Sequence, residues 1–342
     1  MNIQLGDYAE AEKWCLRALK NARQFLGEKH SWTAEFTGNL GLIYLLQGRY
    51  PEAVSVLQGG YDMTHRVFGD HWDTHTVLAN LIRAYVGWGQ LEKAISLREE
   101  LVASRVRCIA ARGKETPNSN QSVPPCGSMR YDGVSSTYTI TGAGMNIWDV
   151  FDEFHFAYKT LDGNGTIEAR IDNVVEYVTR FTRPGIMMRD SMEPTSKRAS
   201  VFIGQGGIIA FECRTKERGP MNSRRICVGD LTLPHWIKLQ RQGNSFTAYH
   251  ASNGLDWEEI QADDPNQPVP VEVTMNEVIH IGLAVTSADV VRTVEARISK
   301  VSTTGAVYPS GPFTESKDIS LLAAPSLTSE TIQIDPENIK DR

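Results

Sequence analysis

The sequence has little of several features that would assign it to a class of proteins. No apolar run among the 342 residues approaches the ~18 that a membrane-spanning helix needs. Lysine and arginine (35) are outnumbered by aspartate and glutamate (41), and the formal net charge of -6 argues against nucleic-acid binding. The five cysteines form no CxxC motif, which favours reduced thiols over a disulfide framework or a zinc site. Because the first residues, MNIQLGDYAEAEKW, lack the basic start and apolar core of a signal peptide, we expect a cytoplasmic protein that binds neither membranes nor nucleic acids.

Motifs that carry catalysis are also scarce. The chain contains no GxSxG motif, and GQGG at residues 204–207 lacks the lysine of a phosphate-binding loop. A retaining glycosidase holds two carboxylates about 5 Å apart, a separation that alternate residues of one strand provide. The nearest such run is Glu168–Arg170–Asp172, where an arginine lies between the carboxylates, and we interpret it as an ion ladder. The sequence therefore predicts no cofactor, while a pair of carboxylates from different strands stays open as an alternative.

The stretch TLDGNGTIEARID, residues 160–172, is similar to the middle of an EF-hand calcium loop. With Asp162 as the third position, Gly165 takes the required sixth, but Thr160 and Ile171 fall where the first and last ligands belong. Threonine is a poor calcium ligand and isoleucine is none, so we predict no metal site here. The flanks alternate apolar and polar residues, and Asp-Gly and Asn-Gly favour tight turns. We interpret the stretch as the tip of a β-hairpin.

Similar segments recur in the first hundred residues. GDYAEA at residues 6–11 returns as GRYPEA at 48–53 and GQLEKA at 89–94, at spacings of 42 and 41 residues. LGEKHSWT and FGDHWDT also recur, which gives His30 and His71 equivalent places and favours a role in the repeat over a metal site. These residues resemble tetratricopeptide repeats of the kinesin-light-chain type. The resemblance implies paired helices that bind a protein partner.

The first repeat is incomplete within residues 1–105, the range that this resemblance covers. The sequence starts just before the second helix of that repeat, so the apolar positions Tyr8, Ala11, Cys15 and Leu19 lack the helix that would cover them. Because solenoid repeats bury their apolar faces on neighbours, we expect a shortened array that self-associates or docks its bare end. Residues 106–127, which include GKETPNSNQSVPP, are polar and proline-rich and are predicted to be a linker.

After the linker the apolar period changes to that of strands. Short alternating runs such as EFHFAYK, GTIEARI and HWIKLQRQ are separated by DGNG, RQGN and SNG. Their order, with NIWDVFDEFHFAYK, RPGIMMRDS and YHASNGLDW, resembles the concanavalin-A-like jelly roll of the regulation-of-enolase type over residues 128–307. The predicted fold class is α+β multidomain, a short α-helical tetratricopeptide solenoid followed by an all-β concanavalin-A-like sandwich. Residues 308–342 are expected to be a mobile tail.

Successive side chains of a β-strand point to opposite faces, so alternate residues in the β half are predicted to face the core or the solvent. Phe154, Phe156, Tyr158, Ile186 and Met188 are predicted to face the core. The opposite parity predicts one exposed, concave face rimmed by tryptophans, and the candidate ligand-binding residues are Trp148, His155, Arg170, Arg189, Glu212, Arg214 and Trp257. Such a face suits a glycan or an acidic ligand, and the competing interpretation is an ordinary solvated sheet face.

Two functions are compatible with these features, because the fold by itself does not specify one. The first is a non-enzymatic adaptor whose helical repeats bind a protein partner and whose sandwich binds a glycan or another polar ligand. The second is an enzyme or biosynthetic-pathway accessory that acts on a small molecule or saccharide at the concave face. A deep pocket with inward carboxylates would favour the second, and a shallow, arginine-lined face would favour the first.

Overall fold

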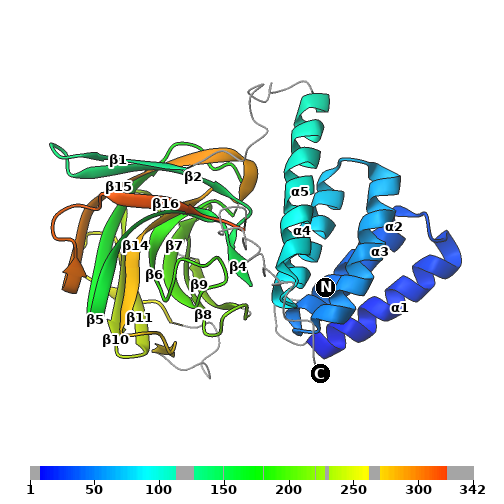
Figure 1. Ribbon diagram of the computed structural model, residues 1–342, viewed down its shortest axis with the longest axis horizontal. Coiled ribbons are helices and arrows are strands. Elements are labelled where there is room, and N and C mark those ends of the chain that lie inside the picture. The colour runs from blue at the N-terminus through cyan, green and yellow to red at the C-terminus, as the bar shows by residue number, and fades with distance from the viewer. Residues whose placement is uncertain are drawn as a thin grey trace, which may run out of the picture.

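The computed structural model describes residues 8–112, 127–148, 150–179, 181–219, 221–227, 231–261 and 270–321. A group of helices stands beside a β-sandwich (Figure 1), which confirms the predicted fold class. The helices are α1 (Tyr8–Leu26), α2 (Ser31–Leu46), α3 (Tyr50–Phe68), α4 (Trp72–Gly87) and α5 (Leu91–Arg112). Among the described residues, no helix is both long and apolar enough to cross a membrane.

The turns between the helices follow the repeat pattern. Gly48 and Gly89 have φ angles of 72° and 81°, a left-handed conformation that glycine enters without the steric cost of a side chain. His30 and His71 are the N-cap residues of α2 and α4, and each imidazole accepts a hydrogen bond from a backbone N–H two residues later. The recurrence of these histidines therefore reflects helix capping.

The first helix is better covered than the sequence predicts. Ala11, Cys15 and Leu19 are buried against Leu40 and Ile43 of α2, so the prediction that these positions lack a cover is wrong. The prediction assumes that only the first helix of the same repeat, which precedes this sequence pattern, could cover these side chains. In the structure the following helix, α2, packs on them instead. The large apolar side chains of α1 that do face solvent are Trp14, Leu16, Phe25 and Leu26.

The β half consists of two antiparallel layers that share one long strand. The strands are β1 (Ser128–Asp132), β2 (Thr137–Gly144), β3 (Ile147–Trp148), β4 (Phe151–Asp152), β5 (Phe154–Val174), β6 (Arg183–Arg189), β7 (Arg198–Gly204), β8 (Ile208–Arg214), β9 (Met221–Cys227), β10 (His235–Gln242), β11 (Ser245–Ala251), β12 (Glu258–Glu259), β13 (Val271–Glu272), β14 (Val278–Thr286), β15 (Asp289–Tyr308) and β16 (Glu315–Ile319). The first half of β5 pairs with β14, which leads through β6, β7 and β8 to β9, and we name this layer the β6 sheet. The second half of β5 lies between β10 and β15, which lead to β11 and to β2, and we name this layer the β10 sheet.

The stretch DGNG bends β5 but does not turn the chain back. Strand β5 runs through it without interruption, so the prediction of a hairpin tip is wrong. Gly163 has a φ angle of 73°, and the pairing of β15 with β5 jumps from Gly165 to Asp162, which is a β-bulge. A Cβ atom on Gly165 would lie 2.5 Å from the carbonyl oxygen of Thr304, so a side chain there would clash. The turn-forming residues instead carry one strand from the β6 sheet into the β10 sheet.

The main core lies between the two sheets, and a second apolar cluster lies on the far face of the β6 sheet. Ile186 faces the main core as predicted, but Phe154 and Phe156 belong to the second cluster, so the prediction that all three share one core is wrong. The register explains the difference. Ile186 lies opposite Leu283, which lies opposite Ala157, so it is Ala157 that shares the face of Ile186.

A shared apolar core joins the helices to the sandwich. The helices contribute Leu78, Ile82, Val86, Ala94, Leu101 and Val102, and the sandwich contributes Met145, Val150, Phe151, Val290 and Leu321. At this junction Arg98 of α5 pairs with Glu153 at 2.7 Å, and each side chain is only 1% exposed. Arg105 adds a second ion pair with Asp289, also at α5. The solenoid therefore docks through α4 and α5, at the end opposite to the predicted bare helix (Figure 1).

Two predicted boundaries differ from the structure. The sequence predicts a linker from residue 106, but α5 continues to Arg112 because Cys108 is buried and Arg107 pairs with Asp70. It also predicts a mobile tail from residue 308, whereas β16 pairs with β5 and buries Ile319. The β16 segment, ESKDI, has a single apolar residue and gives no strand signal. The other parts of that linker and tail, 113–126 and 322–342, lie outside the described residues.

A buried polar chain connects α4 to α5. The Nε2 atom of His75 lies 2.8 Å from the Ser104 hydroxyl, which donates a hydrogen bond of 2.5 Å to Asp70. Burial, followed by the charge of Arg105, lowers the pKa of His75 to about 4. His75 is therefore neutral at physiological pH, and its protonation would place a charge in the interior.

We expect the helices and the sandwich to unfold together. In the Arg98→Met variant the Glu153 carboxylate stays buried without its partner, so the free energy of unfolding should fall by about 3–5 kcal/mol. Urea denaturation followed by fluorescence and circular dichroism measures this loss. The matched control, Arg297→Met, removes an exposed ion pair with Glu295 and should cost under about 1 kcal/mol. Two separate transitions, or an Arg98→Met variant as stable as the control, would contradict the shared core.

Stability should also fall on mild acidification because of His75. Its pKa in the folded protein, about 4, is below the ordinary value of 6.5, so the unfolded chain takes up the proton first. The resulting stabilisation is complete above about pH 6.5 and is lost as the pH falls toward about 4, by up to about 3 kcal/mol. Urea midpoints across this range measure the slope, which His75→Gln should flatten, with His65→Gln as the exposed control. Equal slopes for the wild type and His75→Gln would refute this explanation.

Candidate functional site

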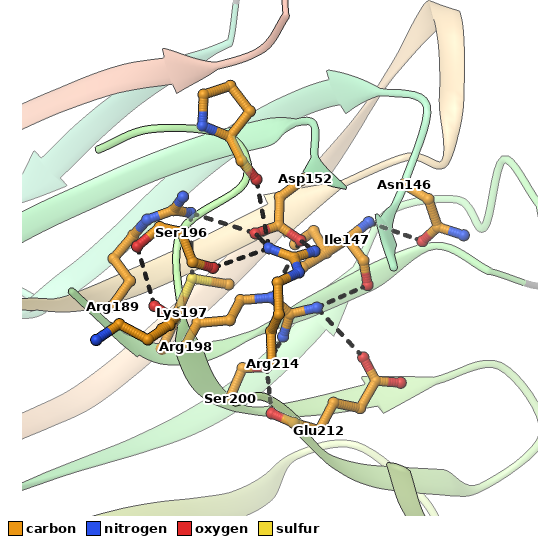
Figure 2. A network of polar contacts seen from close by, with 12 residues as sticks. Asn146, Ile147, Asp152, Arg189, Ser196, Lys197, Arg198, Ser200, Glu212 and Arg214 are labelled. Atoms are coloured by element: carbon orange, nitrogen blue, oxygen red, sulfur yellow. Dashed lines mark hydrogen bonds and ion pairs between the residues drawn. The ribbon is translucent and has the colours of Figure 1, made fainter. Parts of the chain in front are cut away.

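The charged face predicted from strand parity is the far face of the β6 sheet, where the side chains form a buried ion network. Arg189 of β6, Arg198 of β7 and Arg214 of β8 converge on one carboxylate (Figure 2). That carboxylate belongs to Asp152, at the end of β4, and it lies 3.0 Å from Arg198 Nε and 2.7 Å from Arg214 Nη2. Arg189 is farther away, at 3.7 Å.

Main-chain oxygens close this network on its outer side. Arg183 and Arg198 both donate hydrogen bonds to the carbonyl oxygen of Ile147 in β3 (Figure 2 shows the bond from Arg198). Arg189 donates to two carbonyl oxygens of the loop that follows β6, those of Ser191 and Glu193. The β3–β4 hairpin and this loop therefore cover the arginines and exclude water from them.

Three predicted site residues meet in this network but are not exposed. Arg189, Glu212 and Arg214 are each 0% exposed, so the prediction that they form a solvent face is wrong. Glu212 is held by Arg183, with a shortest contact of 2.6 Å. Parity correctly places these residues on one face of the sheet, but it cannot show that a hairpin from elsewhere in the chain packs over that face. A ligand-binding role for them stays a prediction.

Two other predicted residues lie elsewhere. His155 points to the opposite face of β5, where it is 3% exposed and its Nδ1 atom lies 2.8 Å from Asp318 of β16. Trp148 belongs to β3, and its side chain lies outside the described residues. The structure therefore does not form the single face that the sequence predicts.

The last two predicted residues lie on a separate surface, the solvent side of the β10 sheet. Arg170 of β5 is partly buried and pairs with Asp172 at 2.6 Å. Trp257, in the segment between β11 and β12, is also partly buried. The ammonium group of Lys238 lies 4.0 Å from the centroid of the Trp257 ring, within the range of a cation–π interaction.

The buried network stabilises the charge of Asp152. Burial by itself would raise the pKa of Asp152, but the guanidinium groups of Arg198 and Arg214 outweigh it, and the pKa lies below its usual value. Burial lowers the pKa of Arg189 to about 9, which leaves it charged at neutral pH. A carboxylate that stays ionised cannot serve as a general acid. Within the described chain, no three His, Cys, Asp or Glu side chains are grouped as a metal site.

Sequence reasoning missed two central members of the network, Arg198 and Asp152. The sequence contains a signal for Arg198, because it directly precedes the alternating run ASVFIG. The structure then places it opposite both Arg189 and Arg214 in the sheet register. Asp152 gave no comparable signal. It reaches the network from the short strand β4, which belongs to another sheet.

One protein-family model matches part of the chain. The family model described as tetratricopeptide repeat matches residues 1–63. A comparison with curated proteins found no match.

Solved structures match part of the chain at low identity. A functionally unknown protein from Saccharomyces cerevisiae is 14% identical over 54% of this chain and 93% of its own, with a TM-score of 0.42. The carbohydrate-binding module CBM66 from Bacillus subtilis is 11% identical over 52% and 92%, with a TM-score of 0.28. Sheep galectin-11 is 6% identical over 43% and 96%, with a TM-score of 0.27. These likenesses concern the fold alone.

We expect Asp152 to be needed for folding. The Asp152→Asn variant keeps the shape of the side chain but removes the charge that three buried guanidinium groups share, so unfolding should become easier by about 3–5 kcal/mol. The control, Asp172→Asn, removes a partly exposed partner of Arg170 and should cost under about 1 kcal/mol. Urea denaturation compares the two variants. Equal stabilities would show that the network contributes little to the fold.

Proposed function

We propose that this protein is a non-enzymatic adaptor, in which the helical repeats bind a protein partner and the sandwich binds a glycan or another polar ligand. The tetratricopeptide character of the helices supports the first half, because stacked repeats create extended surfaces that bind other proteins. The junction through α5 supports the pairing of the two roles, since a shared apolar core and a buried ion pair join the two parts. A cytoplasmic location stays a prediction.

Exposed tryptophans on the helical part are the observation that carries the proposal. Trp14, Trp32, Trp72 and Trp88 lie in the helices or their turns and are 53, 58, 58 and 44% exposed. In the sandwich, the tryptophans whose side chains the structure describes are partly buried. Tryptophan dominates the energetic centres of protein interfaces, and such side chains are unfavourable in water without a partner. The helical part therefore has the composition of a binding surface.

Two of these tryptophans lie near the corresponding ends of successive helix pairs. Trp32 and Trp72 lie in the first turns of α2 and α4, two residues after His30 and one residue after His71. Both indoles are therefore near the N-terminal ends of their helices, although they do not hold the same position in the repeat. Aromatic anchors at neighbouring helix ends suit an extended peptide segment that crosses successive repeats.

Helix α1 adds a surface that is both apolar and basic. Trp14 and Phe25 are about three helical turns apart and share one face of the helix. Lys13, Arg17 and Lys20 are exposed on the same helix, and the guanidinium group of Arg17 lies 5.8 Å from the centroid of the Trp14 ring. A partner segment that combines acidic and apolar side chains would complement this surface.

The alternative is an enzyme or pathway accessory that acts at the far face of the β6 sheet, and it has less support. A glycoside hydrolase needs two carboxylates that reach the substrate. The two carboxylates of that face, Asp152 and Glu212, are fully buried and each is bonded to an arginine. The adaptor is therefore the function that we put forward.

The Trp32 and Trp72 pair should control binding of the partner. A random-peptide display library selected on the full chain should yield a shared motif, and the double variant Trp32→Ala/Trp72→Ala should bind the selected peptide about 10–100-fold more weakly. Calorimetric titration measures both affinities. The control is Val134→Ala, an exposed apolar residue of the sandwich, which should bind normally. If no motif emerges, or if the double variant binds like the wild type, the protein-binding half of the proposal is wrong.

A further inference from the structure

The solvent face of the β10 sheet carries aromatic and charged side chains in a compact group. Its members, which we name the β10 patch, are Glu168, Arg170, Trp236, Lys238, Tyr249 and Trp257. In the sheet register Trp236 lies opposite Arg170, and Lys238 lies between Glu168 and Tyr249. The alternate residues of the same strands, such as Ile167, Ile237 and Ala248, are buried in the main core. The patch is therefore the outer side of a well-packed sheet.

Contacts within the patch hold its rings in place. Lys238 Nζ lies 4.0 Å from the centroid of Trp257 and 4.8 Å from that of Tyr249, and 3.7 Å from a carboxylate oxygen of Glu168. The backbone at Gly254 lies against Trp236, so closely that a Cβ atom there would be 2.7 Å from the indole. Rings that are already fixed lose little conformational entropy when a ligand stacks on them.

A neighbouring carboxylate has an unused acceptor. Glu259 of β12 lies directly opposite Tyr249, so it projects to the same side of the sheet. Its Oε1 atom is buried and has no hydrogen-bond partner in the part of the chain that the structure describes. An unpaired buried acceptor is unfavourable, and a hydroxyl donor from a ligand would remove that cost.

The charges of the patch are already matched. Arg170 pairs with Asp172 at 2.6 Å, and Lys238 pairs with Glu168. An anionic ligand would have to break one of these pairs and would meet the unpaired Glu259 oxygen, whereas a neutral, hydroxyl-rich ligand can hydrogen-bond to the remaining donors and acceptors. The patch thus differs from the arginine-rich face for an acidic ligand that the sequence predicts.

We propose that the β10 patch is a binding site for a neutral oligosaccharide. A pyranose ring offers an apolar face of C–H groups, which stacks on an indole, and an edge of hydroxyl groups, which bonds to fixed charged side chains. Trp236, Tyr249 and Trp257 provide the rings, while Arg170, Lys238 and Glu259 provide the hydrogen bonds. This inference rests on the proposed glycan-binding half of the function and assigns it to a different face of the sandwich.

The test uses the full chain and a panel of neutral glucan, xylan and mannan oligosaccharides, with uronic-acid oligosaccharides for comparison. The wild type should bind at least one neutral oligosaccharide, and Trp236→Ala and Trp257→Ala should each weaken that binding by at least about tenfold. Trp257→Phe keeps a ring and should recover most of the affinity. Tyr308→Ala, an exposed aromatic residue of β15 outside the patch, is the matched control and should bind normally.

The outcomes separate this inference from the proposed function. If the wild type binds no oligosaccharide, both the patch and the glycan half of the function are wrong. If it binds but both alanine variants bind equally well, the patch is wrong and the glycan function stands. Preference for the uronic-acid oligosaccharides, or a Trp257→Phe variant as weak as Trp257→Ala, would overturn the stacked neutral ligand. Thermal melting of each variant shows whether a loss of binding reflects unfolding, and loss through unfolding alone in both alanine variants counts against the site.

Discussion

Two adjacent buried carboxylates, Asp152 and Glu153, connect the last helix, α5, to the β6 sheet. Asp152 binds arginines from the β6 sheet, and Glu153 binds Arg98 of the last helix. The Glu153 carboxylate also accepts hydrogen bonds from the backbone N–H of Met145 and from the Ser320 hydroxyl. Because a buried charge is tolerated only when it is paired, neither carboxylate can be buried before its partners are in place. The short hairpin that carries them is therefore fixed from both sides.

This arrangement makes the junction between helices and sandwich unlike a flexible linkage. Interfaces between domains of one chain are usually polar and allow relative motion. Here an apolar core from both parts surrounds an ion pair that is about as buried as any in the sandwich. In the described part of the chain no further helix packs on α5, and the sandwich supplies the apolar surface that a capping helix would provide. Each part thus buries apolar side chains of the other.

The sequence predicts those features that depend on local patterns. The glycine turns, the repeat role of His30 and His71 and the alternation of strands such as β10 each follow from residues close together in the chain, and all appear in the structure, where the two histidines cap helices. The failures arise where distant segments meet. DGNG has turn residues, but whether they turn the chain or bend a strand depends on Thr304 and the rest of β15, over a hundred residues away. Arg189, Glu212 and Arg214 were placed on the correct face by parity, yet their burial depends on a hairpin that parity does not describe.

The site residues show the same limit. The alternation of residues along the strands predicts that Arg170 and Arg189 share one exposed face. The bend in β5 instead places them in different sheets, where Arg189 is buried and Arg170 is partly exposed. Trp257 was identified as an aromatic residue of interest, but its neighbours Lys238 and Tyr249 become apparent only when β10 and β11 are paired. Telling a buried network from a solvent-facing patch requires knowing which residues of neighbouring strands lie opposite one another. A single sequence does not contain that register.

Docking of α4 and α5 on the sandwich gives the helical stack a direction. In a solenoid each unit needs a neighbour on both sides, and here the sandwich occupies the side of α5 (Figure 1). The solvent-facing residues of α1, among them Trp14 and Phe25, form the opposite end. Within the described residues, the helical stack therefore has one end covered by the sandwich and one end where α1 presents aromatic side chains to solvent. A further helix that extends the stack would find its apolar surface at α1.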